Sequence, residues 1–514
     1  MAAPLAKDEE DHKKHGEGCS HSHFLVVAYS MQGHVNPART LAHRLAQVSG
    51  CTATLSIPLS GHRRMFPSSS DDDDKEAAIV SDGLISYLPF SDGVDDGTWP
   101  IEEEDRARRR DANFRTLSAI ITRLAASGGR PPVTTVVCTL SMPVVGEVAR
   151  AHGLPLAIYW IQPATVLATY YHYFHGHDDD ELHQLLAAGS SSNLRSDDDE
   201  VVVTLPGMHR PLRIRDMPSF LVEEKTQDGL SKMILQSMRG LFQQMDEEKP
   251  VVLVNTFAAL EDDVVLRAVQ PYMDVEVFAV GPAVPLLKKK DDGGASEERL
   301  AQIHLFQHDE TAAYMEWLDE QPEKSVVYLS FGSLLGYTRR QAEEVLHGLQ
   351  ASGRPYLWVV RREGRAEEVD DLCRLSTAAE KKAAGMVVEW CDQQRVLAHP
   401  SVGCFVTHCG WNSTLEAVVS GVPMVAVPSW SDQPVNAWLV EEGWQVGVRA
   451  ERDGEGTLTR GELARCVELV MGAGDKAVQV RANASGLKQR AREAVAAGGP
   501  LETSLRRFVE FMQK

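Results

Sequence analysis

Short runs of apolar and β-branched residues alternate with longer stretches in which apolar positions recur at helical spacing. The first strand-like run, residues 24–28, is followed by a helical repeat at Ala38, Leu41, Ala42 and Leu45. Further strand-like runs lie at 52–57, 133–138 and 156–161, and a second series at 326–331, 356–360, 386–389, 403–407 and 424–427. This alternation is typical of α/β architecture with parallel sheets.

The proline, glycine and polar residues between these runs predict the domain organisation. Pro37 is expected at the first position of its helix, where a missing N–H costs nothing. A polar, glycine-containing stretch separates the two series and predicts a linker. We expect a disordered tail at residues 1–22 and an N-terminal Rossmann-like domain at 23–284. A linker at 285–310, a C-terminal Rossmann-like domain at 311–497 and a last helix at 498–514 should follow.

Composition excludes several classes of protein. The chain has 43% hydrophobic and 24% charged residues, which is ordinary for a globular protein. Its formal net charge of −21 argues against sequence-independent binding of nucleic acid, which needs a basic surface. No apolar run predicts a signal peptide or a membrane span. Eight cysteines without paired spacing fit a reducing compartment, so we predict a cytoplasmic protein.

Two kinds of cluster could be read as metal sites. Aspartate runs lie at 71–74, 178–180 and 197–199, and a His/Cys group that could bind zinc comprises His12, His15, Cys19, His21 and His23. The aspartates stand in polar surroundings with no adjacent strand, and the His/Cys group stands in a glycine-bearing tail. Solvated segments are the favoured interpretation, and we predict no metal site.

Residues 390–433 carry the densest candidate chemistry. A buried strand-like run leads through His408 into a helical run at 414–420, and Asn412 and Ser413 are residue types that cap or donate at a helix start. The N-terminus of a helix offers backbone N–H groups and the positive end of a dipole. This arrangement suits a pyrophosphate.

Other side chains of the segment suit the rest of a nucleotide sugar. Trp390 follows a strand and offers a flat face to a base. Glu416, one turn into the helix, can accept hydrogen bonds from ribose hydroxyls. Asp432 and Gln433 provide the acceptor and amide groups that sugar hydroxyls need.

Residues 390–433 resemble, without a gap, the secondary product glycosyltransferase signature of plant family 1 UDP-glycosyltransferases, and the resemblance extends over nearly the whole chain from His23 onward. It implies a GT-B fold with the UDP-sugar on the C-terminal domain, the acceptor on the N-terminal domain, and a final helix packed back on the latter. It implies nucleoside contacts from Trp390 and Gln393, diphosphate contacts from Ser333, His408, Asn412 and Ser413, a ribose contact from Glu416, and sugar contacts from Trp411, Asp432 and Gln433. Trp411 and Gln433 are the choices linked with glucose.

His34 follows the first strand directly. A histidine at the carboxyl end of such a strand faces the crevice where ligands bind, and its ordinary pKa of about 6.5 lets it accept a proton at neutral pH. The alternative is a helix-turn histidine without a role, since the chain has 18 histidines. The resemblance implies that His34 is the catalytic base.

Many relatives pair this histidine with an aspartate, and here the position falls on Thr139. A threonine hydroxyl can orient an imidazole but cannot stabilise its charged form. Either another acidic residue takes the place of the aspartate, or the acceptor needs less activation. A carboxylic acid or an acidic phenol would be an acceptor of the second kind.

Four short motifs resemble the branch that contains anthocyanin 5-O-glucosyltransferases and glucosyltransferases of indole-acetic and abscisic acid, whose members also lack the aspartate: residues 23–25, 90–97, 160–164 and 429–434. Residues near the acceptor are expected to include Met31, Met142 and Trp160.

The sequence thus predicts a monomeric enzyme that transfers glucose from UDP-glucose to a small aromatic or carboxylic acceptor, with inversion and without a metal or other cofactor. Two alternatives remain: a UDP-sugar-binding protein without catalysis, and the use of another UDP-sugar. A nicotinamide-dependent oxidoreductase is disfavoured because no Gly-x-Gly-x-x-Gly follows a predicted strand.

Overall fold

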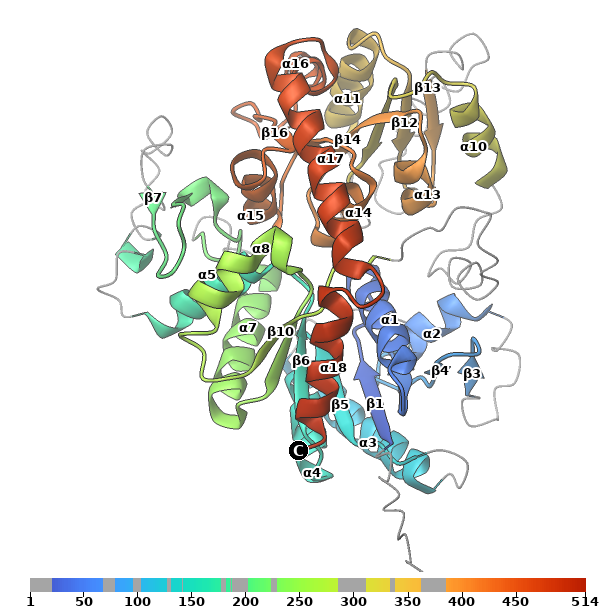
Figure 1. The fold of residues 1–514 in the computed structure, drawn as a ribbon, viewed down its shortest axis with the longest axis vertical. Helices are drawn as coiled ribbons and strands as arrows, with labels where there is room; N and C mark the ends of the chain where they lie inside the picture. The colour runs from blue at the N-terminus through green and yellow to red at the C-terminus, as the bar shows by residue number, and fades with distance from the viewer. Residues whose placement is uncertain are drawn as a thin grey trace, which may run out of the picture.

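Two α/β domains, each built on its own sheet, make up the computed structural model, with the N-terminal domain below the C-terminal domain in Figure 1. The described residues are 21–67, 79–95, 103–126, 131–140, 142–176, 182–184, 186, 202–222, 229–284, 311–332, 338–361 and 385–514.

The N-terminal domain is built on an eight-stranded sheet in the order β10-β9-β6-β5-β1-β2-β4-β3. All of its described pairings are parallel except β3 with β4. Its central strands are apolar and buried along their length, as parallel strands covered on both faces require. The strands are β1 Ser22–Val27, β2 Cys51–Ser56, β3 Val80–Ser81, β4 Ser86–Tyr87, β5 Thr135–Thr139, β6 Leu156–Trp160, β9 Val251–Val254 and β10 Val277–Ala279.

Helices and one small hairpin complete this domain. The hairpin pairs β7 Val202–Val203 with β8 Leu212–Arg213 and continues into the 3-10 helix η2 Ile214–Asp216. The helices are α1 Gln32–Gln47, α2 Leu59–Met65, α3 Glu103–Ala126, α4 Pro143–Ala151, α5 Ala164–His175, α7 Gly229–Glu248, α8 Ala258–Val264 and η4 Val265–Val269.

The C-terminal domain has a six-stranded, fully parallel sheet in the order β13-β12-β11-β14-β15-β16. Its strands are β11 Val326–Ser330, β12 Tyr356–Val359, β13 Gly385–Val388, β14 Val402–Thr407, β15 Met424–Ala426 and β16 Gly447–Arg449. Its helices are α10 Thr311–Asp319, α11 Arg339–Ala351, α13 Gln393–Ala398, α14 Trp411–Ser420, α15 Gln433–Trp438, η5 Leu439–Gly443, α16 Arg460–Met471 and α17 Asp475–Val495.

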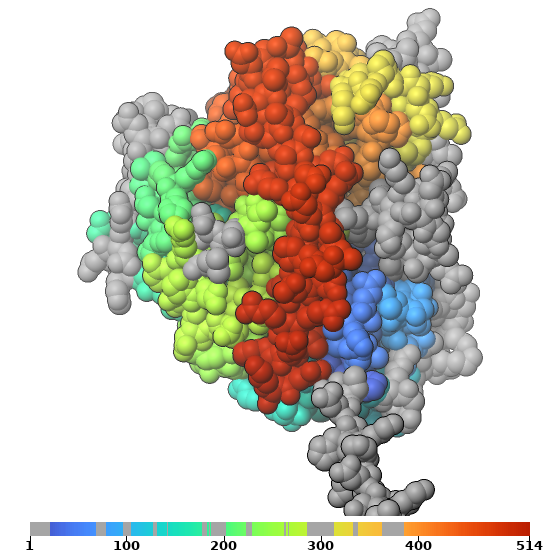
Figure 2. Space-filling model, viewed as in Figure 1, coloured from blue at the N-terminus to red at the C-terminus, as the bar shows by residue number. Residues whose placement is uncertain are grey.

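The last helix, α18 Pro500–Met512, returns to the N-terminal domain. The red band of α17 and α18 runs over both domains in Figure 2. The Phe508 ring is fully buried, and its centroid lies 5.7 Å from that of Phe24 on β1 and 5.9 Å from that of Phe278 on β10. Beyond the helix, the Gln513 amide donates to the Ser22 hydroxyl at 2.9 Å. Helix α18 therefore packs on the N-terminal sheet, which contains β1.

The predicted strands match observed strands to within a few residues, but two local predictions are wrong. Helix α1 begins at Gln32, so Pro37 lies inside it rather than at its start. Ser22, assigned to the tail, already belongs to β1. His23, a member of the zinc alternative, is buried at 1% exposure, with its ring nitrogens bonded to Pro131 O at 2.8 Å and Thr54 Oγ1 at 2.9 Å.

Several sequence features lie outside the described residues: the three aspartate runs, the linker, and His12, His15 and Cys19. Among the residues that are described, no group of three His, Cys, Asp or Glu side chains is arranged to hold a metal ion. Likewise, no described helix combines the length and apolar character needed to cross a bilayer.

Candidate active site

His34 and Thr139 lie close together at the carboxyl ends of two central strands of the N-terminal sheet. Strands β1 and β5 are parallel neighbours, so their carboxyl ends lie side by side. His34 stands in the first turn of α1, which follows β1, and Thr139 is the last residue of β5. His34 Nδ1 lies 3.1 Å from Thr139 Oγ1. The topology thus joins two residues that are 105 positions apart.

Desolvation favours the neutral form of this half-buried imidazole. Desolvation lowers the pKa of His34 from 6.5 to about 4. The Tyr29 ring packs edge-on against it, with centroids 5.9 Å apart. Behind Tyr29, Asp92 is paired with Arg109, whose guanidinium lies 5.2 Å from the Tyr29 ring centroid. Asp92 is thus bonded by Arg109, and the pKa of His34 is set by desolvation.

Helix α14 brings the C-terminal domain to His34. Its N-cap is Gly410, so the expectation that Asn412 or Ser413 caps the helix is wrong. Asn412 Nδ2 instead donates across the domain boundary to Gly33 O at 3.1 Å. This carbonyl is available because Pro37, four residues further along α1, has no N–H to bond with it. The proline inside α1 therefore creates the acceptor that joins the two domains beside His34.

His408 lies in the turn that precedes α14, between two glycines. A Cβ on Gly332, whose φ is +75°, would lie 2.7 Å from the imidazole, and one on Gly410 would lie 2.5 Å from His408 Nε2. His408 Nδ1 is buried without a hydrogen-bond partner among the described residues, and burial lowers its pKa to about 4. A neutral ring with an unused polar atom stands where a diphosphate contact was predicted; Ser333, predicted beside it, lies outside the described residues.

The predicted nucleoside contacts form one hydrogen-bonded group. Gln393 Nε2 donates to Ser413 Oγ at 2.9 Å and to Glu416 Oε2 at 2.6 Å. The Gln394 amide donates to the other oxygen of Glu416 at 3.2 Å. Burial raises the pKa of Glu416 to about 7. Trp390 comes just after β13 and shortly before Gln393, at the same carboxyl edge of the sheet.

The predicted sugar contacts Asp432 and Gln433 start helix α15. Asn436 Nδ2 donates to Asp432 Oδ2 at 2.6 Å, which fixes the carboxylate within its own turn. Gln433 Oε1 accepts from the backbone N–H groups of Ser429 and Trp430 at 2.9 and 3.0 Å. The amide oxygen of Gln433 thus shapes the preceding loop, and its nitrogen is not used in these two bonds.

Trp411 connects the two domains. Its side chain is 4% exposed, and its indole N–H donates to Asn255 O on the N-terminal domain at 2.8 Å. The Trp411 side chain therefore joins the domains, and its predicted contact with the sugar does not come from the indole N–H in this arrangement.

Of the predicted acceptor residues, Met31 and Met142 follow the neighbouring strands β1 and β5. Met31 is the N-cap residue of α1, and Met142 is that of α4, which follows β5. Trp160 instead has no exposed surface and donates its indole N–H to Pro163 O at 3.1 Å. It packs in the core against Tyr170 and Phe242, so it supports the domain from inside rather than lining an open acceptor surface.

Comparison with known proteins decides the family. The family model of UDP-glucoronosyl and UDP-glucosyl transferase matches residues 296–477. Crocetin glucosyltransferase, chloroplastic, of Gardenia jasminoides is 40% identical over 95% of this chain and 97% of its own length. Anthocyanidin 3-O-glucoside 5-O-glucosyltransferase of Verbena hybrida is 39% identical over 96% of this chain and 99% of its own length. The chain belongs to the UDP-glycosyltransferase family.

Solved structures agree with this assignment. The structure of Os79 from O. sativa in complex with UDP is 29% identical, covers 95% of this chain and 100% of its own, and superposes with a TM-score of 0.74. The GT-B fold and the enzyme class, a glycosyltransferase that uses a UDP-sugar, are confirmed, as is the resemblance to the anthocyanin 5-O-glucosyltransferase branch.

Sequence reasoning missed the residues that connect the two domains of this glycosyltransferase. Gly33 and Asn255 contribute backbone carbonyls, which no side-chain pattern reveals. Two signals were present in the sequence. Pro37 marks the free carbonyl four residues before it, and Asn436 stands one helical turn after Asp432.

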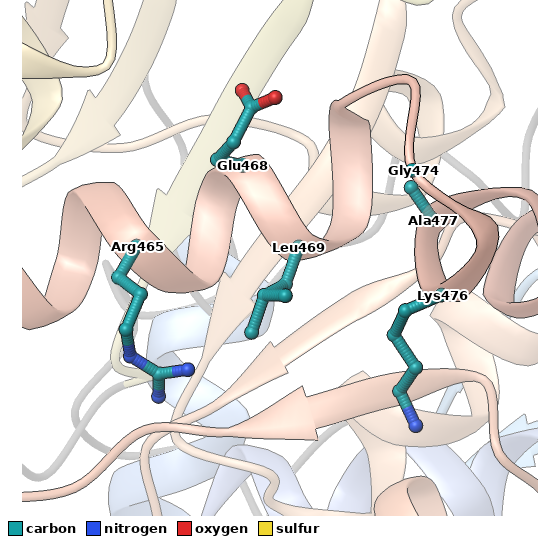
Figure 3. Close-up of a pocket in the computed structure, with 6 residues that line it drawn as sticks. All are labelled: Arg465, Glu468, Leu469, Gly474, Lys476 and Ala477. Carbon is teal, nitrogen blue, oxygen red and sulfur yellow. The ribbon is translucent and has the colours of Figure 1, made fainter.

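A separate cavity of about 300 Å³ lies on the outer side of the C-terminal domain. Figure 3 shows its lining residues on α16 and at the start of α17: Arg465, Glu468, Leu469, Gly474, Lys476 and Ala477. It shares no residue with the site above, and the Arg465 guanidinium is bonded by Glu462 at 2.6 Å.

Proposed function

We propose that this glycosyltransferase transfers glucose from UDP-glucose to a hydroxyl or carboxylate of a small plant metabolite, a phenolic such as a flavonoid or a hormone acid. The observation that carries the proposal is the bond from Asn412 to Gly33. It joins the N-terminus of α14, where an anion is favoured, to the residue next to the candidate base His34. Glucose is supported by Gln433 and by the two curated relatives, which are named as glucosyltransferases.

The proposed reaction is one in-line displacement at the anomeric carbon, which converts an α-linked donor into a β-glucoside or a glucose ester. With Nδ1 turned toward Thr139, the His34 Nε2 lone pair takes the acceptor proton. The bond from the anomeric carbon to the β-phosphate oxygen breaks as the bond to the acceptor oxygen forms. The start of α14, with His408 and Ser413, stabilises the charge on the departing UDP, so no metal ion is required for this role.

The nature of the acceptor follows from Thr139. A hydroxyl at 3.1 Å fixes the ring of His34 but adds no negative charge to stabilise an imidazolium. The low pKa of His34 makes it a weak base. An acceptor that is already ionised or nearly so, such as a carboxylate or an acidic phenol, needs little help from such a base. We therefore propose that these acceptors react faster than simple alcohols.

The experiment is incubation with UDP-glucose and a panel of flavonoids, phenols, carboxylic hormones and aliphatic alcohols, with mass spectrometry of the products and NMR of the new anomeric centre. We expect acceptor-dependent UDP release, β-linked products and the same rate in the presence of a chelator. α-Linked products or a chelator-sensitive rate would contradict the mechanism.

The weak base also favours one second candidate, a UDP-sugar-binding protein without catalysis. That candidate predicts stabilisation of the fold by UDP-glucose with no turnover of any acceptor.

A further inference from the structure

The loop of residues 429–433 carries the proposed sugar contacts, and the N-terminal domain holds it from outside. Ser431 has φ +61°, a left-handed conformation that residues other than glycine seldom adopt. Ser219, from the N-terminal domain, bonds it on both sides. Ser219 N donates to Ser431 O at 2.9 Å, and Ser431 N donates to Ser219 Oγ at 2.7 Å. Asp432 directly follows this constrained residue.

An aromatic contact supports the same loop. Phe220 is 4% exposed and meets Trp430 edge to face, with ring centroids 5.0 Å apart and an interplanar angle of 89°. Gln162, also from the N-terminal domain, places its amide nitrogen 3.5 Å from Ser431 Oγ. Both the ring contact and the amide come to the loop from the N-terminal domain.

A buried ion pair anchors the segment that supplies these contacts. Asp216 and Arg449 are joined at 2.6 Å, and their side chains are 2% and 12% exposed. Arg449 Nη2 also donates to Arg215 O at 2.9 Å, and Asp216 Oδ2 accepts from Arg213 N at 3.1 Å. Arg449 ends β16, the neighbour of β15, and the 429–433 loop begins just after β15. The ion pair thus fixes residues 216–220 against the same edge of the C-terminal sheet.

The nucleoside end of the donor site is organised differently. Gln393 and Glu416 are bonded by Ser413, Gln394 and Tyr328, all of which belong to the C-terminal domain. The N-terminal domain therefore reaches the sugar end through residues 216–220 and Gln162, while the nucleoside contacts are held from within their own domain.

We propose that residues 216–220 position the sugar-binding loop. Ser219 and Phe220 fix the conformation of Ser431 and Trp430, and they thereby place Asp432 and Gln433 for the sugar of the donor. They act as positioning residues that determine donor-sugar affinity and selectivity without touching the sugar. This inference rests on the proposed use of UDP-glucose.

The test compares the binding of UDP with that of UDP-glucose by titration calorimetry, which needs no turnover, and then measures kcat and KM. In Phe220→Ala and Ser219→Ala, we expect UDP-glucose affinity to fall about tenfold, since an error of about 1 Å in placement has effects of this order or larger. UDP affinity should stay within about twofold, because its contacts lie in the other group. Phe220→Tyr should retain UDP-glucose affinity, and the preference for UDP-glucose over UDP-galactose should shrink in both alanine variants.

Asp216→Asn keeps the shape of the anchor and removes its charge, and it provides a second test should Phe220→Ala fail to fold. The matched control is Arg490→Gln, which removes another contact between the domains, a 3.3 Å bond to Ala259 O. The control should leave both affinities unchanged. Equal losses for UDP and UDP-glucose, no loss for either, or the same pattern in Arg490→Gln would overturn the inference. A wild-type enzyme that binds UDP-glucose but transfers no glucose would instead contradict the proposed function.

Discussion

The donor half and the acceptor half of the site are built in opposite ways. Most of the donor residues come from one stretch, 390–433, in which Gln393, Ser413 and Glu416 form one hydrogen-bonded group. Asp432 is held by Asn436, which lies just beyond that stretch. The acceptor half joins His34 to Thr139 across 105 positions through a single bond at 3.1 Å. The donor site is therefore built within one stretch of the sequence. The acceptor half is instead built from segments that follow separate strands.

Burial has opposite effects on the pKa of a histidine in the acceptor half and of a carboxylate in the donor half. It lowers the pKa of His34 to about 4 and raises the pKa of Glu416 to about 7. In each case the neutral form is favoured, because a low-dielectric surrounding disfavours charge. His34 is therefore a neutral base throughout the physiological range, while Glu416 titrates within it. The predictions below test this contrast.

The largest effect is expected at His34. His34→Ala removes the only group that we assign to proton transfer, and kcat should fall by about 10²–10⁴-fold on acceptors that must lose a proton, such as weakly acidic phenols and alcohols. UDP affinity measured by calorimetry should not change, because the donor half stays intact. His175→Ala, at a surface histidine bonded to Asp246, serves as the control and should leave kcat within about twofold. Undiminished turnover by His34→Ala would remove His34 from the mechanism.

A smaller effect is expected at Glu416. Glu416→Ala removes a charge-capable acceptor, and UDP affinity should fall by about 10- to 100-fold, since such hydrogen bonds contribute about 1.5–3 kcal/mol. Because its pKa is raised to about 7, the carboxylate form that accepts from ribose hydroxyls grows as the pH rises. Wild-type UDP affinity should therefore be higher at pH 8 than at pH 6. The variant should lose this pH dependence, and a variant that kept it would assign the titration to another group.

Thr139 should respond differently to two kinds of acceptor. Thr139→Asp supplies the missing charge beside His34 Nδ1 and should raise the pKa of the imidazole. Rates on simple alcohols should then increase more than about tenfold, while those on carboxylates stay the same, since only the alcohols need a stronger base. Thr139→Val, which keeps the size and removes the hydroxyl, is the comparison for orientation alone. Equal gains on both acceptors would contradict the proposed link between Thr139 and acceptor ionisation.

The smallest effect is expected at Pro37, where the two halves join. In Pro37→Ala a backbone N–H becomes available to bond Gly33 O within α1, and it competes with Asn412 for that carbonyl. We expect kcat/KM to fall about threefold, the amount that a neutral hydrogen bond of about 0.5–1.5 kcal/mol provides. Combined with Asn412→Ala, the substitution should add nothing further. Additive losses would mean that Pro37 acts elsewhere.

Contacts within one stretch of the sequence were easier to predict than contacts between distant segments, for a physical reason. Gln393, Ser413 and Glu416 lie within one or two turns of strand ends, so local spacing already brings them together. The contacts that the sequence did not reveal join segments that are far apart in the chain. Trp411 bonds Asn255, Asn412 bonds Gly33 rather than capping its helix, and Trp160 is enclosed by α5 and α7.

The elements of the fold were also predictable where the signal is local and not where it depends on distant segments. The strands were readable from apolar runs, because parallel strands are buried on both faces. The start of α1 was misplaced because a proline is acceptable inside a helix when another group uses the carbonyl it leaves unpaired. Contacts such as Ser219 with Ser431 depend on how the two domains meet, and no local pattern encodes that arrangement.

The position of α18 has a consequence for building chimaeras. Its Phe508 ring packs between Phe24 and Phe278, so the N-terminal sheet is completed by a segment at the far end of the gene. Anyone exchanging acceptor domains between relatives by a single crossover in the linker would combine one parent's sheet with the other parent's covering helix. A hybrid meant to inherit acceptor choice intact needs two junctions, so that residues 22–284 and 500–512 come from the same parent.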